Sequence, residues 1–551
     1  MRRGIFFSIV FILCILFTNC ERDNITNKVP SGNIVVDDDF EEDKYSKVVK
    51  IVFSSSGDAL VTGRDESFSV AVVGNGVTIQ YSGTENVLYE VSGSTNNGFL
   101  KIYSSTEQAI RLTDATIFNP NGAAINIQGS ITNPSKGNLT HIVFRGNNFL
   151  EDGRYYTNTP TGEDEKAVIF SEGQLIFWGS GTLKIDAQGK SGINSDGSVQ
   201  INNSGVLTIT STAGHGIRGA EYILLSRGTN TIKTMADTKK GLSTDGLLQI
   251  DGGETTITVS GNAAYDNEDL NYSGTAGVKT KGDFVINGGI LTITNTGIGG
   301  KGINGDGSAT FKGGLVSITT SGATYTAGDV SSKAIKFQGN IQFLGAEVNV
   351  ECQTNEAIES KSAITVAGGT IYSYSANDDA VNSGGDFTIN DGVFCAHSAK
   401  ADGIDANGNC YIKGGVVYAI GGKSPEVAID ANTEAGYKLY IQGGTIVAIG
   451  GLEKNASLTQ SCYSTNSWSK NSWYALTVGS KTYTFRTPSN GGNTLVISGA
   501  TSPALKSGVT ISGGTNICND MLNLTAAVSG GTAVSLTTYT GNNGGHPGGW
   551  K

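Results

Sequence analysis

Charged side chains recur about every two dozen residues through the middle of this 551-residue chain. They are aligned by a small residue that is followed by an aliphatic one. The position before this pair holds Lys240, Ala276, Lys301, Lys333, Glu356, Asp379 and Asp402. The position after it holds Lys279, Asn304, Lys336, Glu359, Asn382, Asp405 and Asp430. Each series is basic at first and acidic later, so two columns of stacked side chains would offer sites for ligands of opposite charge.

The acidic part of these series predicts a divalent cation site. Carboxylates at about 4 Å repel each other by roughly 1 kcal/mol in water and by roughly 4 kcal/mol at an effective dielectric constant near 20. Calcium accepts carboxylate and amide oxygens in flexible geometry and would remove this repulsion. The predicted Ca²⁺ ligands are Glu356, Glu359, Asp379, Asn382, Asp402 and Asp405. The alternative is a solvated acidic face, on which a Lys333–Glu356 salt bridge contributes little.

The basic part predicts contacts with the carboxylates of an acidic polysaccharide. The residues concerned are Lys240, Lys301, Lys333 and Lys336. Lysine is also common on exposed strands, where it only keeps the surface soluble. A uronate lyase is the enzymatic alternative, with Lys333 or Lys336 as the base beside Glu356 and Glu359. Because nearby carboxylates raise the pKa of a lysine, we expect neither lysine to act as a base.

Aromatic residues provide a second kind of sugar contact. Tyr372, Tyr374 and Tyr418 are predicted to point outward from one face of the repeat. Their rings could stack on sugar rings, or on one another to stabilise the sheet. Trp468 and Trp473 lie in a loop rich in Ser and Asn and form a second aromatic candidate.

These columns require a repeating fold, and the spacing of the pairs defines it. The pairs begin at residues 167, 192, 216, 241, 277, 302, 334, 357, 380, 403 and 428. Two longer intervals contain insertions near residues 263–275 and 323–331. Each unit shows three short stretches with alternating apolar residues, which indicate three strands separated by turns. Leucine-rich repeats have a different register of Leu and Asn, which is absent here.

We therefore predict an all-β fold, a right-handed single-stranded parallel β-helix of about 11–13 coils of roughly 23–25 residues. Residues 47–460 would form this carbohydrate-binding domain. Residues 461–551 lose the period and are predicted to form a C-terminal β cap, which solenoid ends require.

Several segments resemble a family of secreted carbohydrate-binding parallel β-helix proteins with a clostridial founder and a fold similar to that of pectate lyases. The segments are residues 166–171, 179–185, 192–197, 401–406 and 501–508, together with the repeated Gly-Gly turns. The resemblance covers about residues 100–515. It implies noncatalytic binding of plant-type or acidic polysaccharide, with calcium on coil aspartates. His215, Lys240 and Lys301 replace the usual aspartate of that family, which argues against calcium in their coils.

The N-terminus has the layout of a secretory signal. Arg2 and Arg3 precede an apolar run over residues 5–17, which is too short to span a bilayer. Cys20 follows it as in a bacterial lipobox, so residues 1–20 predict a lipoprotein signal with lipidation at Cys20; an ordinary secretory peptide is the alternative. Residues 21–46 predict an acidic tether. The protein would then be a monomeric lipoprotein of the outer membrane or cell surface.

Composition narrows the function further. The net charge of −11 argues against a nucleic-acid partner, which needs a basic face. The four histidines show no zinc-like spacing with cysteines. Five cysteines remain after Cys14 and Cys20, and this odd number implies no disulfide framework. Cys410 is predicted to be a packed thiol. The classes left are a polysaccharide-binding protein, a lyase or hydrolase, and a structural adhesin or spacer.

Overall fold

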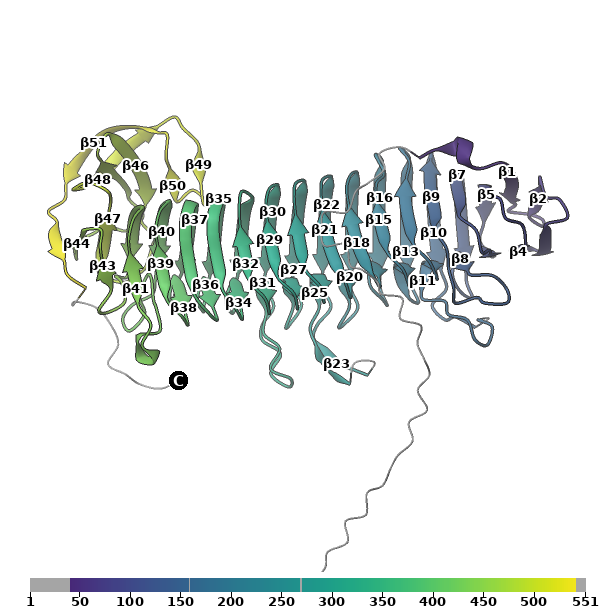
Figure 1. Ribbon diagram of the computed structural model, residues 1–551, viewed down its shortest axis with the longest axis horizontal. Coiled ribbons are helices and arrows are strands. Elements are labelled where there is room, and N and C mark those ends of the chain that lie inside the picture. Colours follow the sequence, from purple (N-terminus) through teal and green to yellow (C-terminus); the bar gives the residue numbers. More distant parts are fainter. Residues whose placement is uncertain (1–39, 158, 268–269, 542–551) are drawn as a thin grey trace, which may run out of the picture. The chain divides into compact units, whose positions relative to one another are not determined.

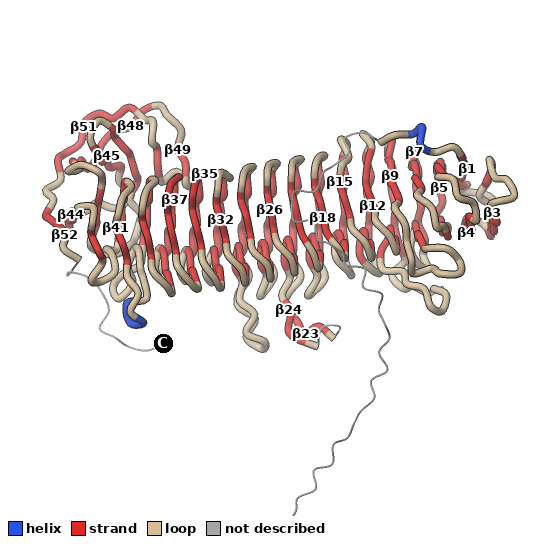
Figure 2. The backbone as a smooth tube through the Cα atoms, in the orientation of Figure 1, coloured by secondary structure: helices blue, strands red, loops and turns tan. Residues whose placement is uncertain are grey.

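The computed structural model describes residues 40–157, 159–267 and 270–541, and strands dominate them (Figures 1 and 2). Three strands form one coil, such as β14 (Ser191–Ser195), β15 (Val199–Ile201) and β16 (Val206–Ser211). The next coil consists of β17 (Ile217–Gly219), β18 (Tyr222–Leu225) and β19 (Thr229–Thr234). Its strands pair in parallel with their counterparts, strand for strand. The protein is therefore all-β and β-helix-like, as predicted, and its right-handedness stays a prediction.

The first strands of the coils form a fourteen-stranded sheet, called here the first-strand sheet. Its members are β3 (Phe68–Val73), β4 (Asn75–Tyr81), β6 (Gly98–Tyr103), β8 (Ile125–Gln128), β11 (Ala167–Ser171), β14, β17, β20 (Lys240–Thr244), β25 (Ala276–Thr280), β28 (Lys301–Gly305), β31 (Lys333–Phe337), β34 (Ile358–Ser360), β36 (Val381–Ser383) and β38 (Ile404–Ala406). Only β3 and β4 are antiparallel to each other.

The second and third strands form two further faces, joined into one thirty-stranded sheet. The second strands include β9 (Thr140–Arg145), β12 (Leu175–Trp178), β15, β18, β21 (Leu247–Ile250), β26 (Phe284–Ile286), β29 (Ala309–Phe311), β32 (Ile341–Phe343), β39 (Cys410–Ile412), β41 (Leu439–Ile441) and β43 (Ser457–Leu458). The third strands include β10 (Asn147–Asp152), β13 (Thr182–Ala187), β16, β19, β22 (Glu254–Val259), β27 (Ile290–Asn295), β30 (Leu315–Thr320), β33 (Glu347–Cys352), β40 (Val416–Ile420) and β42 (Thr445–Ile449). The long strands β7 (Gln108–Asn119), β35 (Ile364–Ser375) and β37 (Phe387–Ser398) run through both faces.

The register confirms the sequence alignment of the repeats. Ile193 pairs with Ile217, and the ladder continues through the aliphatic residue of each later pair to Ile404. Isolated bridges extend it to Ile429 and Leu452. Residues about two dozen apart are thus neighbours in adjacent coils.

The small residue of each pair has a packing reason. A Cβ atom added to Gly216 would lie 2.3 Å from Cγ2 of Ile232, and one added to Gly241 would lie 2.4 Å from Cγ2 of Ile257. The corresponding third-strand residue is also Ile for the pairs at 192, 277 and 302. Where the pair begins with alanine, at 334, 357 and 380, the residue sixteen positions later is Val, Ser or Ala. A small first-strand residue therefore makes room for a large third-strand residue within the same coil.

Both insertions leave the stack next to the first-strand sheet (Figure 1). The first follows β22 and contains the hairpin β23 (Ala264–Asp266) and β24 (Asn271–Ser273). The second follows β30 and is closed by a bridge between Tyr325 and Val330. Tyr272 of the first insertion lies near Tyr325 of the second, with ring centroids 5.9 Å apart. The two insertions therefore pack together.

The N-terminal end of the described stack contains β1 (Lys47–Phe53), β2 (Leu60–Thr62) and β5 (Val87–Thr95). The short helix η1 (Glu42–Lys44) precedes them, and Glu42 forms a salt bridge with Arg111 at 2.5 Å. The predicted signal peptide and lipidation site at Cys20, and most of the acidic tether, lie outside the described residues. Within the described part of the chain, no helix has the length and apolar character needed to cross a membrane.

The parallel pairing of the coils gives way to antiparallel pairing after β43. Strands β44 (Cys462–Thr465), β47 (Leu495–Ser498) and β52 (Thr537–Tyr539) are antiparallel, and the helix η2 (Thr433–Ala435) lies in a loop before β41. A separate six-stranded sheet, called here the C-terminal sheet, contains β49 (Asn516–Ile517), β50 (Leu522–Asn523), β46 (Lys481–Arg486), β45 (Trp473–Val478), β48 (Ala504–Ser512) and β51 (Ala527–Ala533).

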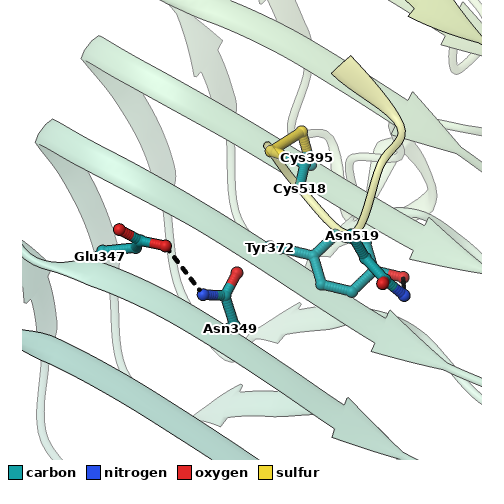
Figure 3. Close-up of a disulfide and its surroundings, with 6 residues drawn as sticks. All are labelled: Glu347, Asn349, Tyr372, Cys395, Cys518 and Asn519. Carbon is teal, nitrogen blue, oxygen red and sulfur yellow. Dashed lines mark hydrogen bonds between the residues drawn. A yellow bond between two sulfur atoms is a disulfide. The ribbon is translucent and has the colours of Figure 1, made fainter. Parts of the chain in front are cut away.

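A disulfide joins the C-terminal sheet region to the coils. Cys395 on β37 bonds to Cys518, 123 residues later (Figure 3). The odd cysteine count implied no disulfide framework and did not predict this single bond. Cys352, Cys410 and Cys462 remain free and buried, and Cys410 is the packed thiol that its inward position predicted.

Candidate functional site

A groove of about 930 Å³ runs along the outer face of the first-strand sheet. Residues from β14, β20, β25, β28 and β31 line it, and it reaches from Asp164, just before β11, to Gln338. At about 4.8 Å per strand, the distance from β11 to β31 is about 29 Å. Tyr272 and Val330 of the two insertions also line this groove. A long open channel of this kind fits an extended polymer better than a compact metabolite.

Basic side chains predominate in the lining. Lys or Arg occurs at positions 166, 190, 218, 239, 240, 279, 281, 301 and 336, and Asp or Glu at positions 164, 165, 245, 266 and 306. Several of the cations are paired: Arg218 contacts Asp245 at 2.8 Å, and Lys279 contacts Asp306 at 2.5 Å. Lys190 and Lys281 are exposed, and Lys281 also contacts Asp245, at 2.9 Å. We call this lining the basic groove.

The structure places three of the predicted sugar-binding lysines in one column and Lys336 in the other, and most of the four are buried. Lys240, Ala276, Lys301 and Lys333 are successive neighbours in the ladder. Nζ of Lys240 donates to the carbonyl of Thr238 and, at 3.1 Å, to Oγ of Ser273. Nζ of Lys301 donates to the carbonyl of Ser331 at 2.9 Å. Residue Lys301 is only 8% exposed. Both lysines therefore line the groove while holding the bases of the insertions.

Lys333 is engaged by carboxylates. Its Nζ lies 2.8 Å from Oε1 of Glu356 and 2.7 Å from Oε2 of Glu359, so the predicted Lys333–Glu356 salt bridge is confirmed. Burial opposes its charge, but the two glutamates outweigh burial and raise the pKa of Lys333. Burial also opposes the charge of Glu359, yet Lys333 and Lys361 hold the pKa of its carboxyl at about 2. Lys333 is thus a buried ion-pair partner and a poor base.

Lys336 and Lys301 differ from Lys333. Burial lowers the pKa of Lys336 although Glu359 lies 3.5 Å away. The expectation that nearby carboxylates would raise the pKa of this lysine was wrong, because burial outweighs the single glutamate. Burial, followed by the charges of Lys336 and Lys333, lowers the pKa of Lys301 to about 7. The end of the groove at β28 and β31 therefore holds crowded and incompletely neutralised cations.

The acidic part of the columns forms a ladder in which Glu359 is buried and Asp379, Asn382, Asp402 and Asp405 are half-buried. Lys336 neighbours Glu359, which neighbours Asn382, which neighbours Asp405. In the other column Oδ1 of Asp379 accepts a hydrogen bond from the backbone N–H of Asp402 at 2.9 Å. Nδ2 of Asn382 donates to Asp405 at 2.9 Å. The predicted ligands Asp379, Asn382, Asp402 and Asp405 are therefore brought together.

Burial and mutual repulsion strongly perturb these carboxyls. Burial, then Asp405, raises the pKa of Asp379 to about 8. Burial, then Glu356, raises the pKa of Asp405 to about 6, and burial followed by Asp379 raises that of Asp402 well above its usual range. Among the described residues, no three His, Cys, Asp or Glu side chains are grouped so that they could hold a metal ion. Calcium binding here stays a prediction.

Two of the predicted sugar-stacking tyrosines are not accessible. Tyr372 is 4% exposed and Tyr418 is 1% exposed, because the C-terminal sheet region packs over them. The hydroxyl of Tyr418 donates to the carbonyl of Arg486, and Asn519 donates to the hydroxyl of Tyr372 at 3.4 Å (Figure 3). The expectation that these two rings face a ligand is therefore corrected. Tyr374 is half-buried against His397.

The tryptophans also pack within the protein. Trp468 and Trp473 are half-buried, and Nε1 of Trp468 donates to the carbonyls of Gly492 and Asn493. Neither residue lines the basic groove.

The sequence reasoning missed several groove residues. Arg218 occupies the position after the Gly216–Ile217 pair and neighbours Ser243, which neighbours Lys279. Extending the column toward the N-terminus would have found Arg218. Tyr272 lies in an insertion outside the repeat, so the spacing carried no information about it.

The site is thus a long groove with a mostly basic lining on one face of a repeated, coiled β scaffold. The chain belongs to the family described as carbohydrate-binding domain-containing protein, whose model matches residues 73–276, 222–324 and 320–517. This finding confirms the family suggested by the sequence and identifies a carbohydrate-binding protein.

Among solved structures, a polysaccharide lyase-like protein from C. thermocellum, solved as a gadolinium derivative, is similar at 19% identity with a TM-score of 0.34. The match covers 46% of this chain and 96% of that one. No curated protein matches the chain.

Proposed function

We propose that this protein binds an anionic, uronate-containing polysaccharide along the basic groove without cleaving it. The observation that carries the proposal is the run of lysine and arginine side chains over adjacent coils from β11 to β31. Each exposed ion pair contributes only about 0.2–1 kcal/mol. A polymer that contacts several cations at once accumulates these small contributions, which suits a flat, repetitive surface.

The proposal is tested by affinity gel electrophoresis with polygalacturonate and alginate, with dextran as the uncharged comparison. We expect retardation by the acidic polymers that weakens as salt screens the charges. A Lys190→Gln/Lys336→Gln variant should bind about 2- to 25-fold more weakly, since each contact is worth up to about 1 kcal/mol. Lys423→Gln, at an exposed lysine outside the groove, is the matched control. Equal binding by the double variant and the wild type would refute the groove assignment.

The proposed function also includes a bound calcium ion and a lipid anchor. Calcium on the acidic ladder would neutralise Asp379, Asp402 and Asp405 and would steady the coils next to the groove. A lipid on Cys20 would place the groove at the cell envelope, on the outer membrane or cell surface. The Cys395–Cys518 disulfide supports an oxidising compartment, where such bonds persist.

A uronate lyase is the second candidate, and the lowered pKa of Lys301 favours it. A lysine that is partly neutral near pH 7 can accept a proton, which Lys333 cannot do while Glu356 and Glu359 hold its charge. Incubation with polygalacturonate and Ca²⁺, followed by ultraviolet absorbance of unsaturated sugar ends, separates the two functions. If unsaturated product forms with the wild type and not with a Lys301→Met variant, the protein is a lyase and the noncatalytic proposal is wrong.

A further inference from the structure

We propose that the two insertions form an aromatic wall, made of Tyr265, Tyr272 and Tyr325, that stacks on the sugar rings of a polysaccharide lying in the basic groove. The inference rests on the proposed function and deepens it by adding an apolar contact to the ionic ones. The ligand class is a polysaccharide whose pyranose rings offer an apolar face to tyrosine and whose acidic groups reach the lysines.

The three rings form one connected group. Tyr265 and Tyr272 meet edge to face, with centroids 5.3 Å apart and planes at 81°, and Tyr272 and Tyr325 lie 5.9 Å apart. Tyr265 is 47% exposed and Tyr272 is 39% exposed. Tyr272 lines the groove, and Tyr265, which contacts it, extends this exposed aromatic surface away from the polar channel, so a bound chain would meet apolar ring faces beside the charged lining.

The wall is fixed to the floor of the groove at two points. Lys240 donates to Oγ of Ser273 in the first insertion, and Lys301 donates to the carbonyl of Ser331 at the end of the second. Both lysines belong to the column that forms the groove. The two buried cations therefore set the position of the tyrosines relative to the basic residues, which reduces the ordering cost of binding.

The insertions also fit each other closely. A Cβ atom added to Gly328 would lie 2.3 Å from the ring of Tyr272, so the second insertion packs on this ring through a residue without a side chain. Gly299, in the coil between them, leaves room in the same way for Ala263 and Val330. The two long loops are thus built as one unit, and loops carried on a rigid scaffold are where binding residues concentrate.

The chemistry of tyrosine matches a sugar ring. Its flat apolar faces can cover the C–H groups of a pyranose, and its hydroxyl can exchange hydrogen bonds with sugar hydroxyls. Lys281 and Lys336 lie in the same groove and can take the carboxylates of the chain. A simple anion such as phosphate offers no ring to the wall, so the geometry selects an acidic polysaccharide.

The test measures binding of a polygalacturonate oligosaccharide by calorimetry and by saturation-transfer NMR. Tyr265→Ala should weaken binding about 2- to 12-fold, the range expected for loss of one aromatic contact, while Tyr265→Phe should stay within about twofold of the wild type. Irradiation of the aromatic protons should transfer saturation to the ring protons of the sugar, and Tyr265→Ala should reduce this transfer. Tyr437→Ala, at a tyrosine that is 41% exposed and lies outside the groove, is the matched control.

The outcomes separate the wall from the groove. If Tyr265→Ala binds like the wild type while Lys190→Gln/Lys336→Gln binds weakly, the wall is refuted and the groove stands. If the wild type binds none of the acidic polymers, the proposed function itself fails. Thermal unfolding of each variant shows whether the fold is kept. Tyr272→Phe preserves the packing on Gly328 and is a second variant that should bind like the wild type.

Discussion

Lys301 shows how a single buried cation can make polymer binding depend on pH. In the free protein its pKa is about 7, first because it is buried and then because Lys336 and Lys333 repel its charge, while Glu359 opposes this lowering. A carboxylate placed beside it favours the charged form and raises its pKa. Below about pH 6 the lysine is charged whether or not ligand is bound, so affinity is flat. As the pH rises through about 7, free Lys301 loses its proton, and we therefore expect affinity for polygalacturonate to fall.

Calorimetry in buffers with different ionisation enthalpies measures this directly. Near pH 7.5 the complex should take up protons, up to about one per bound site, and affinity should fall by up to about tenfold for each further pH unit until the pKa of the complex is passed. Lys301→Met should remove both effects, whereas Lys423→Gln should leave them unchanged. Proton uptake that persists in Lys301→Met would assign the pH dependence to another group.

For single residues, the sequence predicted which side chains are neighbours better than it predicted how buried each side chain is. The column Lys240, Lys301, Lys333 was correct because the repeat fixes which residues are neighbours. The burial of these lysines could not be predicted, since the groups that cover them come from insertions and from glutamates in the next coil. The predicted exposure of Tyr372 and Tyr418 was wrong for a similar reason, because the residues that cover them lie about 70–150 positions later in the sequence.

Within one coil, the pairing of a small first-strand residue with a large third-strand residue determines the shape of the core. Gly241→Ala would place a Cβ atom 2.4 Å from Cγ2 of Ile257 and 2.7 Å from the carbonyl oxygen of Gly277. We expect this overpacking to lower the free energy of unfolding by about 1–3 kcal/mol. Gly57→Ala, at an exposed glycine whose Cβ would meet only Ser54 Oγ at 3.8 Å, should change stability by less than about 0.5 kcal/mol.

A double-mutant cycle measured by chemical denaturation identifies the partner. If Ile257 causes the clash, Gly241→Ala should cost at least about 1 kcal/mol less in an Ile257→Ala background. Equal costs in both backgrounds would mean that the carbonyl of Gly277, and not the side chain, limits the position. The repeat could be recognised in the sequence because this steric requirement returns in five coils, those of the pairs that begin at 192, 216, 241, 277 and 302. The C-terminal sheet has no such requirement, so the sequence predicted only that a β appendage was present there.

Over the whole molecule, stacked coils depend on their neighbours, so a local charge problem affects the stability of a long stretch of chain. The acidic ladder of β36 and β38 presents such a problem. Burial raises the pKa of Asp379 to about 8 and that of Asp405 to about 6, whereas in the unfolded chain both are near 3.9. The folded state therefore prefers the protonated carboxyls. This contribution to stability is complete below about pH 4 and is lost as the pH rises to 8, by about 1.4 kcal/mol for each unit of pKa difference.

We therefore expect the thermal midpoint without added metal to fall between pH 5 and pH 8, and Asp379→Asn to flatten this dependence while it keeps an oxygen for the Asp402 N–H. Calcium should raise the midpoint at pH 8, where the carboxyls are ionised, and much less at pH 5. Asp186→Asn, at a half-buried aspartate on the third-strand face, is the control that should leave the pH dependence intact. If the midpoint falls with rising pH but does not respond to calcium, the perturbed acidic ladder is supported and the calcium site is contradicted. A midpoint independent of pH would contradict the prediction, because burial and repulsion between the carboxylates should make their ionisation oppose folding.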